Sequence, residues 1–153
     1  MGMILLLIVH GLLAVALLGA VTHQLVSVWW PVRQAAGTFV TRFRAVPSAS
    51  YVGAVIVLYA LTALLGAFIY THYTITARVA LIQLQLWKPY GLFEMKEHFA
   101  AIGLGILPAY WYFWQPSAAA ENPRARAILT SLLAFAVWWN FLVGHIINNI
   151  RGF

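Results

Sequence analysis

The sequence contains no cysteine. Disulfides, thiolate-ligated haem, iron–sulfur clusters held by this chain alone and lipid anchors on cysteine are therefore excluded. Histidine and carboxylate side chains remain as the strong ligands that the chain could offer to a metal or a cofactor.

Charged residues are also scarce. They make up 8% of the chain and hydrophobic residues 63%, whereas an average soluble protein has roughly 25% charged residues. A soluble domain of this size could not bury so much apolar surface, but a lipid bilayer removes that constraint. The composition therefore predicts one integral membrane domain over residues 1–153 rather than a soluble enzyme, with no room for a separate globular module.

Acidic residues are rarer than basic ones, three against nine, which gives a formal net charge of +6. The basic residues lie between apolar runs and form no continuous stripe, so nucleic acid is not an expected partner. We expect them to anchor the chain at anionic lipid headgroups. The first apolar run has no basic leader and no convincing cleavage site, which favours a retained first helix over a signal peptide.

Four apolar runs, at about residues 3–28, 51–72, 93–114 and 127–149, are each close to the ~20 residues that cross a hydrocarbon core. Because lipid offers no partner to unpaired backbone groups, the runs predict an all-α bundle of four transmembrane helices joined by short loops. The segment from Thr74 to Pro89 is only moderately apolar and partly alternating. It fits either an interfacial helix or a short extended hairpin.

Four spans place both termini and the 73–93 loop on one membrane side, called side A, and the 31–50 and 115–126 loops on side B. Side B has the five arginines Arg33, Arg42, Arg44, Arg124 and Arg126, and side A has the four cations Arg78, Lys88, Lys96 and Arg151. The positive-inside rule therefore favours side B as cytoplasmic, in a bacterial inner membrane or its equivalent.

Four of the five histidines are expected at one depth. His10, His72, His98 and His145 lie on four different runs, and at ~1.5 Å rise per residue all fall in a layer roughly 10 Å deep near side A. His23 is the exception, on side B. Helix bundles hold cofactors in this way, and imidazole is a good axial ligand for haem iron. The four histidines are therefore the candidate cofactor-binding residues.

The most charged point of the chain precedes His98. Glu94 lies four residues before His98, on the same helix face, and Glu97 is adjacent to it. The carboxylates could orient an imidazole, ligate a metal or transfer protons beside a quinone. As an alternative to haem, His10, His98, His145, Glu94 and Glu97 form a candidate metal site. Equally, the acids could simply complement the dipole of a helix N-terminus, with Lys96 solvated.

The overall plan is similar to small four-helix membrane cytochrome b subunits that link redox partners to the quinone pool, which is an analogy of architecture alone. We expect a small non-catalytic membrane subunit of a respiratory or photosynthetic electron-transfer complex. It would hold one b-type haem near side A between His10 and either His98 or His145. Lipid, other membrane subunits and quinone are the expected partners. The alternatives are a cofactor-free structural or anchor subunit, and a subunit with a histidine-rich metal or chlorin site.

Overall fold

The computed structural model describes residues 2–32 and 37–150, and within them it is almost wholly helical, with no strand. The long helices are α1 (Gly2–Trp29), α3 (Val52–Ile75), α5 (Trp87–Phe113) and α7 (Pro123–Ile150). The short ones are α2 (Phe39–Arg44), the 3₁₀ turn η1 (Ser48–Tyr51), α4 (Ala77–Gln83) and α6 (Pro116–Glu121). The all-helical prediction is confirmed for these residues.

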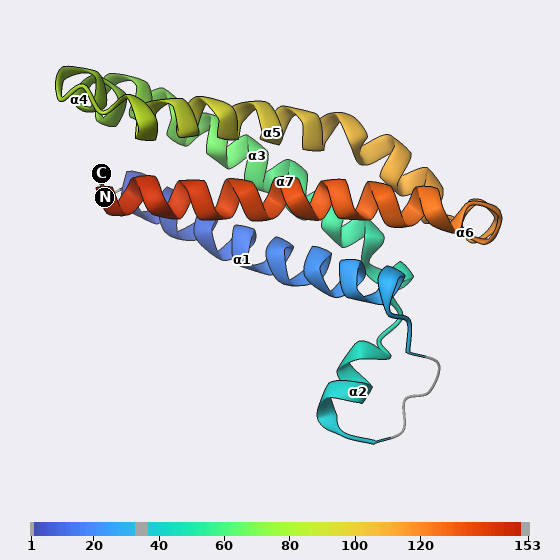
Figure 1. Cartoon of the computed structure of the whole chain (residues 1–153). Helices are drawn as coiled ribbons and strands as arrows, with labels where there is room; N and C mark the ends of the chain where they lie inside the picture. The colour runs from blue at the N-terminus through green and yellow to red at the C-terminus, as the bar shows by residue number, and fades with distance from the viewer. Residues whose placement is uncertain (1, 33–36, 151–153) are drawn as a thin grey trace.

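The long helices run back and forth along one bundle (Figure 1). Both ends of the chain and α4 lie together at one end of the bundle, and α2 and α6 lie at the other. We call these end A and end B, because they hold the segments expected on sides A and B. Which membrane side each end faces stays a prediction, and two cations counted for it, Arg33 and Arg151, fall outside the described residues.

Three helical segments of the described chain are long and apolar enough to cross a membrane: Gly2–Trp29, Ser48–Ile75 and Pro123–Asn149. They indicate a membrane-embedded protein. The fourth helix, α5, is equally long but less apolar, because Lys96, Glu97 and His98 lie within it. The structure therefore supports three of the four expected membrane spans.

Helix α5 begins at Trp87, six residues before the start expected from the apolar run. Pro89 is compatible with this earlier start, because a proline in a first helical turn replaces a backbone N–H that has no partner there. Of the two structures expected for residues 74–89, helix is the one observed, since α4 occupies the middle of the segment and its ends belong to α3 and α5. Gln85, in the left-handed region at φ 54°, then turns the chain into α5.

Helix α7 packs between α1 and α5, and α3 packs mainly against α1 (Figure 1). The contact between α3 and α5 is the loosest of these interfaces. Near end A it consists largely of aromatic rings, with Tyr73 of α3 stacked on Phe93 of α5 at 3.7 Å between ring centroids. The end-B half is filled by a continuous apolar cluster that includes Val21, Val55 and Leu133.

One polar cluster is buried in the end-B half. Gln24 is fully buried; its side-chain oxygen accepts a hydrogen bond from the Tyr110 hydroxyl, and its amide donates to the Ser48 carbonyl at 3.0 Å. His23, the residue before Gln24 on α1, accepts from the Tyr51 hydroxyl and donates from Nε2 to the Phe43 carbonyl at 2.9 Å. His23 thus ties α1 to the segment between α1 and α3.

Replacing Tyr110 by Phe is expected to lower stability, because the buried oxygen of Gln24 would lose its donor while the ring volume stays the same. A buried unsatisfied acceptor costs roughly 1–3 kcal/mol. Unfolding of the purified protein in detergent micelles, followed by circular dichroism, measures the loss. Tyr112→Phe is the matched control, since Tyr112 is exposed on the same helix. Equal stability of the two variants would show that the bond contributes nothing.

Candidate functional site

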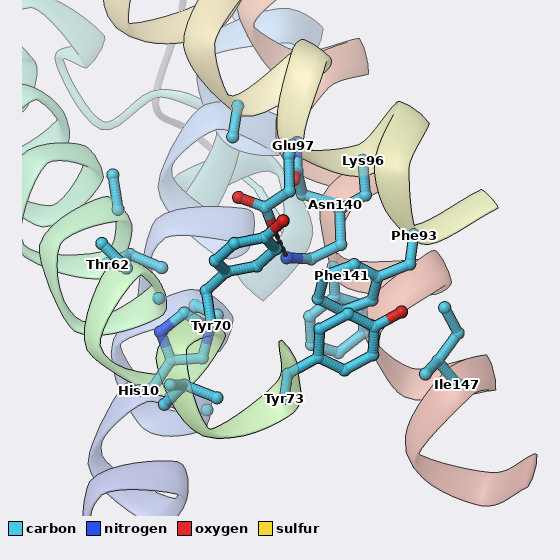
Figure 2. Close-up of a pocket in the computed structure, with 18 of the residues that line it drawn as sticks. His10, Thr62, Tyr70, Tyr73, Phe93, Lys96, Glu97, Asn140, Phe141 and Ile147 are labelled. Atoms are coloured by element: carbon cyan, nitrogen blue, oxygen red, sulfur yellow. Dashed lines mark hydrogen bonds and ion pairs between the residues drawn. The ribbon is translucent and has the colours of Figure 1, made fainter. Parts of the chain in front are cut away.

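A cavity of about 510 Å³ lies in the end-A half of the bundle and is lined by residues of α1, α3, α4, α5 and α7 (Figure 2). Its walls are rich in small residues, which leave space where larger side chains would fill the bundle: Gly11, Ala14, Ala63, Gly66, Ala67, Ala77, Ala100, Ala101 and Gly144. Aromatic rings complete the walls: Tyr59, Tyr70, Tyr73, Phe93 and Phe141. A cavity of this size, lined mostly by apolar side chains, is large enough for a small, largely apolar ligand.

His10 lines this cavity from α1 and packs against α3. A methyl group added at Gly66 would lie 3.4 Å from Cε1 of the His10 ring, in ordinary van der Waals contact, so the ring lies close to the α3 backbone. The Nδ1 atom of His10 is buried and makes no hydrogen bond of normal geometry among the described residues, although the Thr62 backbone is a polar neighbour of the ring. Buried polar atoms in proteins nearly always have a partner, so this imidazole is a good candidate for a ligand contact.

His145 also lines the cavity, from α7, and its ring lies parallel to Phe141 at 6.4 Å between centroids. The other two expected histidines do not line it. His72 is half-buried near the end of α3. His98 is exposed on α5. The structure therefore brings two of the four candidate histidines, His10 and His145, to one cavity.

The expected partnership between Glu94 and His98 takes a different form. His98 donates from Nδ1 to the backbone carbonyl of Glu94 at 2.7 Å, the ordinary acceptor one turn back, and not to its carboxylate. The carboxylate of Glu94 lies instead 3.8 Å from Nε of Arg78 in α4. Arg78 also donates to the Tyr90 hydroxyl at 2.9 Å, so these residues hold α4 against α5.

The five residues named for a metal site are therefore spread over two places. His10, His145 and Glu97 line the cavity, whereas Glu94 pairs with Arg78 and His98 is exposed. Over residues 2–32 and 37–150, no group of three or more histidine or acidic side chains is placed to hold a metal ion. A site for a cofactor ligated by one or two histidines requires no such group.

An ion pair projects into the cavity from α5 (Figure 2). The Lys96 ammonium lies 2.9 Å from Oε1 of Glu97 and 4.8 Å above the Phe93 ring, and its side chain passes close to Gly144. The Lys96 side chain is 15% exposed and that of Glu97 36%. The alternative of a solvated Lys96 beside acids in a first helical turn is wrong, because α5 starts earlier and turns both residues toward the cavity.

Sequence reasoning missed Lys96 as a cavity residue. The available signal was its position: charged groups inside a long apolar helix usually face the bundle interior. Asn140 of α7 lines the same cavity, and its amide donates to the Ala136 carbonyl one turn earlier at 2.7 Å.

No protein-family model matches the chain, and neither curated proteins nor solved structures show a significant match to it. The function is therefore argued from the cavity alone.

Gly103 is required where Tyr59 closes the cavity. A Cβ at Gly103 would collide with the buried Tyr59 ring, whose hydroxyl donates to the Ala100 carbonyl at 3.1 Å. Gly103→Ala is expected to destabilise the protein by about 1–3 kcal/mol through overpacking. Gly105→Ala, where nothing lies within 4 Å of the added atom, is the control and should keep wild-type thermal stability in detergent. Similar melting of both variants would mean that Tyr59 does not lie there.

The Lys96–Glu97 pair should show coupling in a double-mutant cycle of Lys96→Met and Glu97→Leu. Each single change leaves one charge alone in an apolar cavity, at a cost of roughly 1–3 kcal/mol, less than for a fully buried pair because Glu97 is partly exposed. The double variant should be more stable than the sum of the single changes predicts by about 1–2 kcal/mol. Chemical unfolding in micelles measures the cycle, with exposed Glu121→Gln as control. Additive effects would contradict the pairing.

Proposed function

We propose that this chain is a small membrane subunit of a respiratory or photosynthetic electron-transfer complex, and that its cavity binds one b-type haem between His10 and His145. The observation that carries the proposal is that these two histidines, from the adjacent helices α1 and α7, line the same cavity. Imidazole pairs on facing helices are how bundles commonly hold haem iron. Of the two axial partners considered for His10, both are exposed, and only His145 lines the cavity.

The walls of the cavity suit the rest of the macrocycle. Small residues leave room for a flat ring system, and Tyr70, Tyr73 and Phe141 offer aromatic surface beside it. His10 is half-buried, and its buried Nδ1 atom would gain a partner from a ligand. When bound, a haem supplies one-electron transfer; the chain contributes the ligands, the apolar surroundings and the exclusion of water.

We also propose that α5 is the fourth span. Its two interior charges, Lys96 and Glu97, neutralise each other and point into the cavity rather than toward lipid, which is how intramembrane charges are usually accommodated. At 27 residues, α5 is long enough to span a membrane. The pair therefore explains why a helix of lower hydropathy can cross the bilayer with three apolar ones.

A reduced-minus-oxidised absorbance spectrum of the protein, purified from its native membrane with any partner subunits, tests the haem proposal. We expect a b-type α-band in the wild type that is lost in His10→Ala and in His145→Ala. His98→Ala, which changes a histidine outside the cavity, should keep the band.

Three other results would reject the proposal in informative ways. A red-shifted chlorin band would indicate pigment, and a featureless wild-type spectrum would support a cofactor-free structural subunit. Loss of the band in His98→Ala but not in His145→Ala would assign the second ligand to α5 and contradict the site described here.

A further inference from the structure

Lys96 is the one lysine or arginine side chain that lines the cavity, as far as the described residues show. An ammonium group carries three N–H donors. Glu97 accepts from it at 2.9 Å, and the Phe93 ring lies below it at 4.8 Å. The group therefore has the capacity to donate to a further acceptor within the cavity.

The ion pair is local, because its two members are adjacent in the chain. Glu97 is the more exposed of the two, 36% against 15% for Lys96. Rotation of the Glu97 side chain would release the ammonium without moving α5 or any other helix. Lys96, in contrast, is held by the Phe93 ring and by α7 at Gly144. The geometry thus has a fixed cation and a displaceable anion.

Glu97 also indicates which chemical group the Lys96 ammonium can bind. A carboxylate already occupies the position beside the Lys96 ammonium, so a carboxylate of a ligand would make the same charge-assisted bond. In an apolar cavity such a group would be costly to bury without a counter-ion. Asn140 lines the same cavity and, beyond its bond to Ala136, has a second N–H donor for the same ligand group.

We infer that the cavity selects a flat ligand that carries a carboxylate, with Lys96 as the counter-ion and Glu97 as the group that the ligand carboxylate displaces. The inference rests on the proposed function, since the propionates of a b-type haem are such carboxylates. It adds a role for Lys96, Glu97 and Asn140 that axial ligation by histidine does not require.

The test compares hemin with hemin dimethyl ester, which has the same ring and iron but no free carboxylate. Both are titrated into the cofactor-free protein in detergent and followed by absorbance. Lys96→Gln should weaken hemin binding about tenfold, whereas Glu97→Gln, which removes the competing carboxylate, should strengthen it, since pairs between charged groups commonly contribute this much. Neither variant should change binding of the ester by more than about twofold. Lys88→Gln, an exposed lysine on the same helix, is the control for net charge.

The opposite signs of the two variants keep the inference falsifiable. If Lys96→Gln does not fold, the Glu97→Gln variant decides alone. Equal effects on hemin and on its ester, or weaker hemin binding in Glu97→Gln, would overturn the role of Lys96 while leaving the haem proposal in place. Failure of the wild type to bind either compound would overturn the proposed function and the inference with it.

Discussion

The hydrogen bond from the Tyr110 hydroxyl to the Gln24 side chain joins α5 to α1, two helices of the described bundle whose backbones do not meet directly. Both groups are fully buried, so each would be costly to leave unpaired in apolar surroundings. The bond therefore holds the end-B half of the bundle together across its centre. The cavity lies in the other half of the bundle, at end A.

The cavity combines features that a merely structural bundle does not need. Glycine and alanine from every long helix keep it open, at the cost of dispersion contacts that larger side chains would make. Into this space the chain places a histidine with an unpartnered nitrogen, His10, and an ion pair, Lys96 with Glu97. An interior charge and an unpartnered polar atom both lower the stability of the fold. Proteins usually keep such destabilising groups only at functional sites. The coincidence of these features in one cavity favours binding over packing.

Much of the fold could be predicted, because uninterrupted apolar length fixes which segments form long helices. The start of α5 could not, since the polar residues before Phe93 and the proline at Pro89 concealed two helical turns. The depth of each histidine could be estimated from its position along its apolar run, but the earlier start of α5 moves His98 toward the middle of that helix. Which histidines share a cavity depends on helix rotation, about 100° per residue, and hydropathy does not define it. That rotation turns Glu97 inward and the next residue, His98, outward, and so removes His98 from the site and adds Lys96.

An experimental density map of the protein purified from its native membrane, with its partner subunits retained, tests the central claim most directly. We expect a flat density feature filling the cavity, continuous with the rings of His10 and His145 and with one edge beside Lys96. A cavity closed by the surrounding side chains, or filled by the thread-like density of a lipid chain with no contact to either imidazole, would contradict it.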